Sequence, residues 1–269
     1  MQANEQELMM ALRGGLRGRF RQSFHLLEAA FEVLDDRMAH CVTPDEYETM
    51  QPILRQITEQ LLSLQRLGEH AADAAIAPVL HQACAPRAMD LLGQLRELAE
   101  LLNEILLQES VEASVRVQAA ENLGVLLTMG DDTLLNGLLA NLVSNSLAAG
   151  TPVQITLSCE PGRLYYRDNG PGLPEDAAAL LESGVWSDRL LEQGGLGLPL
   201  IRAYAAAMGW TLKVEREAGT CVCFSLPPCT LDLGSMVLES TAGTPSQRQR
   251  RRQDLWRELH PVLPQTPEK

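Results

Sequence analysis

The fold is decided by the stretch LYYRDNGPGL at residues 164–173, in which a short strand runs straight into a glycine-rich turn. A hairpin turn over residues 160–163 leads into this strand. Gly170 and Gly172 have no side chain, so the backbone there can approach a flat ligand closely. The same Asn-Gly-Pro-Gly run also suits an ordinary tight turn. Taken alone, the stretch predicts a strand followed by a turn and leaves ligand binding open.

The segments around this turn switch between strand and helix patterns. Alternating apolar residues predict strands at residues 114–118, 125–128, 153–157, 211–214 and 221–226. Helical periodicity predicts helices over residues 88–105, 132–149 and 198–208. This order predicts an α/β sandwich in which helices cover one face of a mixed sheet.

The N-terminal part of the chain has a purely helical pattern. Apolar residues recur at steps of three and four over residues 12–41, and again from Tyr47 to Ala75, with a break at Thr43-Pro44. The second run is a heptad seam, and two such helices joined by a short turn form an antiparallel hairpin. Two copies packed as a four-helix bundle would bury both seams. Packing of one hairpin on its own chain's second domain is the alternative.

These patterns divide the chain into three parts. Interruptions near Ala77-Pro78 and Ala85-Pro86 separate a helical hairpin domain at residues 1–80 from a sandwich domain at residues 85–228. Residues 229–269 are rich in Ser, Thr, Gln, Pro and Arg, which predicts a largely disordered tail with a helical turn near Trp256 and Leu259. The predicted fold class is α+β, a long helical hairpin (a dimeric four-helix bundle) followed by an α/β sandwich.

Two further segments carry residues suited to a phosphate-bearing ligand. NLVSNSL at residues 141–147 places Asn141 and Asn145 on one helix face, where an amide oxygen can ligate a hard cation. GGLGL at residues 194–198 opens a helix, whose N-terminal N–H groups favour anionic phosphate. Each segment is weak evidence alone, because asparagines are common on helix surfaces and glycine loops are common in general.

The order and spacing of the three segments resemble the catalytic ATP-binding domain of sensor histidine kinases, a superfamily shared with gyrase and MutL. The family's N box resembles residues 141–147, its first glycine box residues 168–173 and its second residues 194–198, and Gly219-Thr220 matches its closing pattern. The resemblance covers residues 85–228, and the hairpin at residues 12–75 resembles the family's dimerisation domain. It implies a Bergerat-type fold that binds ATP and Mg2+.

The resemblance also implies a role for each matching residue. Asn145 would hold Mg2+, and Asn141 stands where ATPases of the superfamily often carry a catalytic Glu. Asp168 would bind the adenine amine, and Gly170 and Gly172 would line the adenine pocket.

The second glycine box and the closing strand would complete the nucleotide site. Gly195 and Gly197 would lie at the phosphates, and residues 174–193 would form a lid over them. The remaining residues expected to contact the cofactor are Leu196, Leu198 and Thr220.

The chain departs from the family pattern near the phosphates. Ala148-Ala149 replaces the basic residue that commonly follows the N box, and the aromatic signature of the lid is missing from residues 181–186. Phosphate contacts would then fall to Arg189 or Arg202, between which the sequence does not decide.

The family's phosphoacceptor is an exposed His on the first hairpin helix, and His25 occupies that position, one residue after the seam residue Phe24. Leu26 replaces the family's acidic neighbour, and the later residues of the motif are Glu28 and Ala29-Ala30. Glu28 lies three residues along the same helix, within reach of His25. The resulting hypothesis is that His25 accepts the phosphoryl group and Glu28 replaces the missing acid.

Two functions from different classes follow. The first is a cytoplasmic, homodimeric histidine kinase that autophosphorylates from ATP and passes the phosphoryl group to the receiver domain of a response regulator. The alternative is a catalytically inactive ATP-binding dimeric module that docks a response regulator or a kinase. A serine kinase acting on an anti-anti-sigma factor would fit the ATPase domain but would not explain the hairpin.

Composition limits the partners and the location. The formal net charge is −13, which argues against a general nucleic-acid binder, because such proteins present basic surface to phosphates. No apolar run reaches the length that spans a bilayer, and the N-terminus lacks the pattern of a secretory signal. These features predict a cytoplasmic protein with no membrane span and no nucleic-acid partner.

Overall fold

The computed structural model describes the chain in two compact units, Met1–Ile76 and Ala77–Lys269, called here the hairpin unit and the sandwich unit. The described residues are 2–84, 86–150, 152–185, 187–189, 195–215, 218–229 and 245–263.

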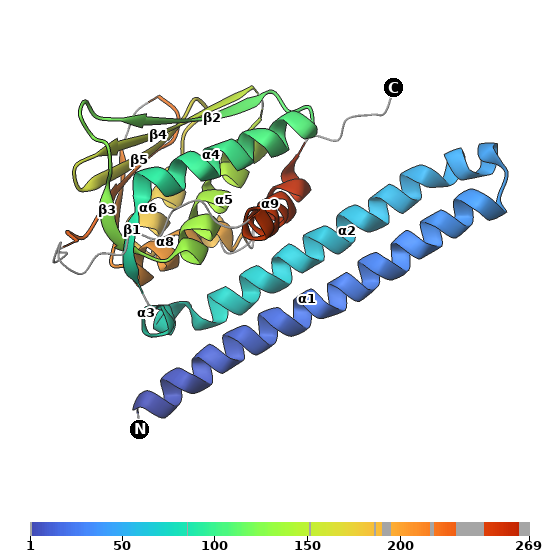
Figure 1. Cartoon of the computed structure of the whole chain (residues 1–269), viewed down its shortest axis with the longest axis horizontal. Coiled ribbons are helices and arrows are strands. Elements are labelled where there is room, and N and C mark those ends of the chain that lie inside the picture. Colours follow the sequence, from blue (N-terminus) through green and yellow to red (C-terminus); the bar gives the residue numbers. More distant parts are fainter. Residues whose placement is uncertain are drawn as a thin grey trace. The chain divides into compact units, whose positions relative to one another are not determined.

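The hairpin unit consists of two antiparallel helices, α1 (Gln2–Cys41) and α2 (Pro44–Ile76) (Figure 1). A capping box starts the second helix. The Glu46 carboxylate accepts hydrogen bonds from the Thr43 backbone N–H at 3.0 Å and from its hydroxyl at 2.8 Å, and the Glu46 N–H donates back to that hydroxyl at 3.4 Å. Pro44 takes the first helical position, where no N–H is needed. The turn residues therefore fix where α1 ends and α2 begins.

The two helices contact each other through mixed polar and apolar pairs, and they leave much of the predicted seam exposed. Arg21 forms a two-pronged ion pair with Glu69, with nitrogen–oxygen distances of 3.1 and 3.3 Å. The Tyr47 hydroxyl donates to Asp35 at 2.9 Å. The seam residues whose apolar side chains remain exposed are Phe20, Leu27, Leu34, Met50, Ile57 and Leu64. One hairpin by itself does not cover its own seam.

The sandwich unit is built around a five-stranded sheet with the order β2-β4-β5-β7-β6, in which β2 and β4 are parallel and the other neighbours antiparallel. A second, two-stranded sheet pairs β1 with β3. The strands are β1 (Arg87–Asp90), β2 (Ala113–Ala119), β3 (Leu127–Gly130), β4 (Val153–Glu160), β5 (Arg163–Asp168), β6 (Thr211–Glu215) and β7 (Cys221–Ser225). The helices are η1 (Ala77–Val79), α3 (Leu80–Ala83), α4 (Leu91–Gln108), α5 (Asp132–Ala148), α6 (Glu175–Ser183), α8 (Gly197–Ala207), α9 (Pro245–Leu259) and η2 (His260–Val262).

One face of the large sheet carries the core. Along β4 the side chains of Val153, Ile155 and Leu157 are buried, while those between them are more exposed. This period of two gives the strand one apolar face. Helices α4, α5 and α8 contact β2, β4 and β6 and lie along the same side of the sheet (Figure 1). The predicted α+β class, with helices on one face of a mixed sheet, is confirmed.

The start of the third predicted helix differs from the sequence-based expectation. Ala88 was expected on the apolar face of that helix, but Arg87–Asp90 forms β1 and pairs with β3, and α4 begins at Leu91. Gly130 packs closely against Met89 of β1; a Cβ there would lie 2.5 Å from the Met89 sulfur. The pairing also shifts the predicted strand at residues 125–128 to Leu127–Gly130.

The tail also differs from the expectation of disorder. Within residues 229–269, Pro245–Leu259 forms the helix α9, which contacts α4 and α5. Leu255 and Leu259 of α9 are buried. The Arg and Gln residues that suggest disorder form the polar face of an amphipathic helix. The tail therefore belongs to the sandwich unit over its described part.

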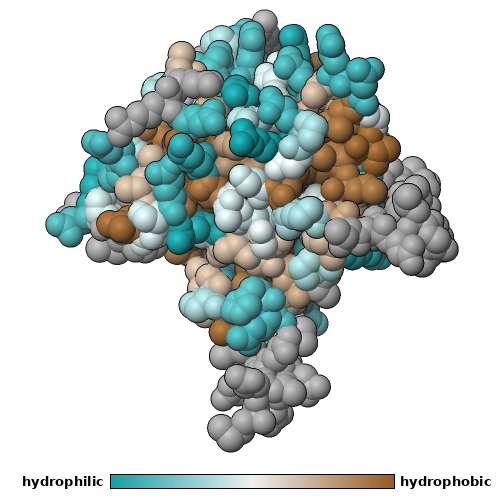
Figure 2. All heavy atoms as spheres, turned by 90° about the vertical axis from the view of Figure 1, so that its left-hand side faces the viewer, coloured by the Kyte–Doolittle hydropathy of each residue, from teal (hydrophilic) through white to brown (hydrophobic). Residues whose placement is uncertain are grey.

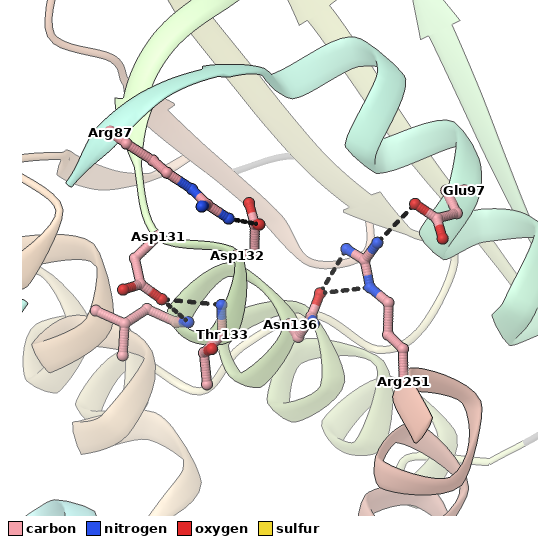
Figure 3. A network of polar contacts seen from close by, with 8 residues as sticks. Arg87, Glu97, Asp131, Asp132, Thr133, Asn136 and Arg251 are labelled. Atoms are coloured by element: carbon pink, nitrogen blue, oxygen red, sulfur yellow. Dashed lines mark hydrogen bonds and ion pairs between the residues drawn. The ribbon is translucent and has the colours of Figure 1, made fainter. Parts of the chain in front are cut away.

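Arg251 is the centre of the polar contacts that attach α9. Its guanidinium lies 2.8 Å from the Glu97 carboxylate on α4 and donates two hydrogen bonds to the Asn136 side-chain oxygen on α5, at 2.7 and 3.1 Å (Figure 3). Burial lowers the pKa of Arg251, and the charge of Glu97 opposes that shift. Arg248 adds an exposed ion pair to Glu104 at 2.6 Å. A single arginine thus joins three helices.

The start of α5 is fixed in the same region. Asp131 caps the helix by accepting hydrogen bonds from the N–H groups of Thr133 and Leu134, at 2.9 and 3.1 Å (Figure 3). Arg87 of β1 forms an ion pair with Asp132 at 2.5 Å. Both contacts lie at the first turn and set where the helix that carries Asn141 and Asn145 begins.

The surface carries both hydrophilic and hydrophobic residues. Figure 2 shows one face of the molecule, on which hydrophobic patches interrupt a largely hydrophilic surface. In the described part of the sandwich unit, the exposed large apolar side chains are Leu107, Val125 and Val185. None of the described helices is both long enough and apolar enough to cross a membrane.

Replacing Arg251 should destabilise the sandwich unit. We expect Arg251→Ala to lower its free energy of unfolding by about 2 kcal/mol, because the partly buried carboxylate of Glu97 and the side-chain oxygen of Asn136 would lose their partner. The exposed neighbour Arg250 is the matched control, and Arg250→Ala should change stability by less than about 0.5 kcal/mol. Urea unfolding followed by tryptophan fluorescence measures this unit selectively, because Trp186, Trp210 and Trp256 all lie in it. Equal stability of the two variants would contradict the role assigned to Arg251.

Candidate functional site

Asp168 ends β5 and connects two loops through its carboxylate. The side chain is buried, and its Oδ1 atom accepts hydrogen bonds from the backbone N–H groups of Gly170 and Thr220, both at 2.9 Å. The Asp168 N–H donates to the carbonyl of Thr220 at 3.0 Å. The first glycine turn and the start of β7 therefore meet at one acid.

Two glycines allow this close approach. Gly219 has φ +85°, and a Cβ there would overlap the carbonyl oxygen of Asp168. Gly172 has φ +84°, and its Cβ would lie 3.1 Å from the carbonyl oxygen of Gly219. A residue with a side chain would be strained at both positions, because positive φ favours glycine. The DNGPGL segment and the closing Gly-Thr pair are thus packed backbone to backbone.

Ser146 and Tyr166 contact the other oxygen of the same acid. The Ser146 hydroxyl donates to Asp168 Oδ2 at 2.5 Å and lies 2.7 Å from the Tyr166 hydroxyl. Tyr166 is fully buried, and burial raises the pKa of its phenol far above the usual value. Neither residue is predicted from the sequence. The available signal was the serine directly after Asn145; its bonds to Tyr166 and Asp168 form only when α5 and β5 are brought together.

Asn141 and Asn145 lie on α5 and face the start of α8. The Asn141 amide donates to the Gly137 carbonyl at 2.8 Å, while its buried Oδ1 atom has no hydrogen-bond partner among the described residues. A Cβ on Gly197 would lie 3.0 Å from Asn141 Oδ1 and 3.7 Å from Asn145 Oδ1. A buried, unpaired oxygen is costly in a folded protein. It indicates a site that is completed by a ligand.

The second glycine box supplies the N-terminus of α8. The helix begins at Gly197, and Leu196 before it makes no side-chain cap. Gly195 is exposed, and Leu198 is half-buried in the first turn. Gly194 lies outside the described residues. The first N–H groups of a helix without a side-chain cap are suited to bind an anion.

The residues present fit a nucleotide with a hard cation. Among the described residues, no group of three or more His, Cys, Asp or Glu side chains could hold a metal ion by itself. A cation at Asn145 would therefore take its other ligands from the nucleotide and from water, as Mg2+ commonly does. The unpaired Asn141 oxygen and the Asn145 oxygen both lie close to Gly197, the first residue of α8.

Neither candidate phosphate-binding arginine is free in the structure. Arg189 forms a two-pronged ion pair with Asp176 of α6, with both distances 2.9 Å. Hydrogen bonds from Ser187 and the Ala177 N–H, together with Arg189, lower the pKa of Asp176. Arg202 donates to the carbonyl groups of residues 181 and 182 at the end of α6. The structure therefore engages both arginines within the predicted lid at residues 174–193, of which residues 186 and 190–193 lie outside the described part.

A shallow cavity of about 340 Å3 adjoins the first glycine turn on the outer face of the sheet. It is lined by Gln154, Thr156, Arg167, Asp168, Asn169, Gly170, Ala218 and Gly219. The amide pair on α5 is not among these lining residues. The cavity therefore does not account for the unpaired oxygen of Asn141.

His25 lies on α1 in the hairpin unit and is exposed. Its Nδ1 atom is 3.2 Å from the Glu28 carboxylate. Phe24 and Phe31 are half-buried, whereas Phe20 and Leu27 are exposed. The structure thus brings His25 and Glu28 together, as their spacing predicts.

A family model matches a large part of the sandwich unit. Residues 130–230 match the family model described as histidine kinase-, DNA gyrase B-, and HSP90-like ATPase. This range includes both asparagines, Asp168, the second glycine box and Thr220.

Curated relatives match a larger part of the chain. The sensor protein kinase CarS of Pseudomonas aeruginosa is 33% identical over 174 residues, which cover 62% of this chain and 36% of that protein. The C4-dicarboxylate transport sensor protein DctB of the same organism is 27% identical over 218 residues, which cover 75% of this chain and 33% of that protein. The chain spans about a third of the length of these relatives.

A solved structure shows a similar fold. The crystal structure of full-length ShkA in complex with AMPPNP has a TM-score of 0.53 and 19% sequence identity, and the match covers 80% of this chain and 48% of that chain. At this identity the similarity concerns the fold.

Proposed function

Because the chain carries a histidine kinase-, DNA gyrase B- and HSP90-like ATPase domain and is related to sensor histidine kinases, we propose that it is a histidine protein kinase of a two-component system. The family resemblance found in the sequence is confirmed. The observation that carries the proposal is the buried, unpaired Asn141 oxygen beside the glycine-rich start of α8. Autophosphorylation and transfer to a response regulator are the proposed steps.

The proposed nucleotide site uses residues from three segments. Asp168 accepts a hydrogen bond from the adenine amine, and Gly170 and Gly172 leave room for the base. Asn145 holds Mg2+, which when bound neutralises phosphate charge. Asn141 orients the ligand from the buried side of α5, and an amide there cannot act as a general base toward water.

The phosphate end of the proposed site lies at the start of α8. The N–H groups near Gly195 and Gly197 bind phosphate oxygens, and Leu196 and Leu198 shape the first turn. Thr220 contributes by binding Asp168 through its N–H. The protein positions the reacting groups, which is the main contribution that phosphoryl transfer requires.

The proposed acceptor is His25, and the proposed partners are a second copy of the chain and the receiver domain of a response regulator. A neutral imidazole is a competent nucleophile near neutral pH. The exposed seam of the hairpin supports a homodimer, because a second copy would remove these apolar side chains from water. The proposed location is the cytoplasm, where ATP is available. The departures at Leu26 and Ala29-Ala30 favour the second candidate, a catalytically inactive ATP-binding module that docks a response regulator or a kinase.

Nucleotide binding should raise the melting temperature of the sandwich unit. ATP with Mg2+ at about 100 times its Kd should add about 2.7 kcal/mol to stability, because it binds only the folded state. Asn145→Ala should remove the part of this shift that depends on Mg2+, so that its shifts with Mg2+ and with EDTA become equal. Thermal unfolding followed by tryptophan fluorescence measures both. An unchanged melting curve for the wild type at millimolar ATP would contradict nucleotide binding.

Dimerisation should depend on the seam of α2. Leu64 lies on the predicted seam and Leu67 lies beside it, and both are 53% exposed in the single chain. We expect Leu64→Glu to convert a dimer into monomers, because a charge would be buried in the bundle. Leu67→Glu, the control with equal exposure, should remain dimeric. Light scattering on the full chain gives the masses, and a monomeric wild type at micromolar concentration would overturn the proposed homodimer.

Phosphoryl transfer to His25 should leave an acid-labile, base-stable label from radioactive ATP. His25→Gln should abolish the label. His40→Gln is the matched control, because His40 is also exposed on α1 and also lies near an acidic residue, Asp36. Glu28→Gln should slow labelling about 100-fold if Glu28 acts as the general base. Equal labelling of wild type and His25→Gln would exclude His25, and an absence of label with ATP binding intact would favour the inactive module.

A further inference from the structure

The three groups Tyr166, Ser146 and Asp168 form a hydrogen-bonded chain with a defined direction. Ser146 has one hydroxyl proton and two acceptors nearby, Asp168 Oδ2 at 2.5 Å and the Leu142 carbonyl at 3.2 Å. The shorter contact is to a carboxylate, and bonds to an ionised acceptor are the stronger ones. The proton therefore points to Asp168.

The Tyr166 hydroxyl is the first donor of this hydrogen-bonded series. Ser146 Oγ is its one hydrogen-bond partner among the described residues. The phenol is fully buried and stays protonated, because burial raises its pKa. Its proton must then be donated to Ser146, whose own proton is directed to the acid. Successive donations of this kind strengthen one another.

These hydrogen bonds leave the Asp168 carboxylate with a single open acceptor position. A carboxylate offers about four lone-pair sites. Oδ1 accepts from the N–H groups of Gly170 and Thr220, and Oδ2 accepts from Ser146. The remaining site is one lone pair of Oδ2, and the serine hydroxyl fixes its direction. Such a site accepts one N–H donor and repels a carbonyl oxygen placed there.

We infer that Ser146, held by Tyr166, is a positioning and specificity-determining residue that makes the site select a purine with a 6-amino group over one with a 6-oxo group. This inference rests on the proposed nucleotide site at Asp168. It adds that discrimination depends on the buried hydroxyl pair as well as on the acid. Ser146 acts through Asp168 and does not itself contact the ligand.

The test compares ADP with inosine diphosphate, which differ in the donor or acceptor at position 6 of the base. Calorimetric titration with Mg2+ gives the two Kd values for each full-length variant. Wild type should prefer ADP, and Ser146→Ala should reduce that preference about tenfold by weakening ADP alone. Ser146→Thr, which keeps the hydroxyl, should restore it.

Two controls separate positioning from loss of fold. Ser144→Ala removes another buried serine hydroxyl from the same helix and should keep the wild-type preference. The double variant Ser146→Ala with Tyr166→Phe removes the orphaned phenol as well, and it should show the same reduced preference as Ser146→Ala. Equal weakening of ADP and inosine diphosphate in Ser146→Ala, or an unchanged preference, would overturn the inference while leaving nucleotide binding intact. Absence of ADP binding by wild type would instead refute the proposed function.

Discussion

The carboxylate of Asp168 accepts hydrogen bonds from three parts of the chain that are distant in sequence. These are the turn at Gly170, the start of β7 at Thr220 and the helix α5 at Ser146. Each bond to the ionised group is stronger than a bond between neutral groups. Because the acid ends a central strand, these bonds set where the glycine turn and the closing loop leave the sheet. One side chain therefore holds together the three segments that form the adenine end of the proposed site.

The phosphate end of the proposed site depends on α5, which is covered on several sides. Helix α8 and helix α9 both contact it, and β4 lies beneath it. A helix surrounded in this way has little exposed surface, so the buried Asn141 is not an ordinary surface residue. Its unpaired oxygen costs stability in the free protein. Functional sites are where proteins commonly carry such unfavourable groups.

Local patterns predicted most of the sandwich unit because its strands alternate and its helices have one apolar stripe. They failed where long-range pairing decided the outcome. Arg87–Asp90 is a strand because β3 is available 40 residues later, and α9 is a helix because α4 and α5 offer acidic and apolar partners. The link between Ser146 and Asp168 spans 22 residues and has no periodic signature. Motif spacing, by contrast, indicated the asparagines, Asp168 and the glycine boxes directly.

The two units carry complementary parts of the proposed chemistry. The hairpin unit presents an exposed imidazole beside a carboxylate, and the sandwich unit presents the groups suited to a nucleotide. An exposed His gains nothing from burial or from a low-dielectric surrounding, so its reactivity would depend on how closely the nucleotide is brought to it. The rate of phosphoryl transfer would then be set by the encounter of the two units, within one chain or between two copies. The Asp168 and Asn141 contacts would keep the nucleotide in a fixed orientation until that encounter occurs.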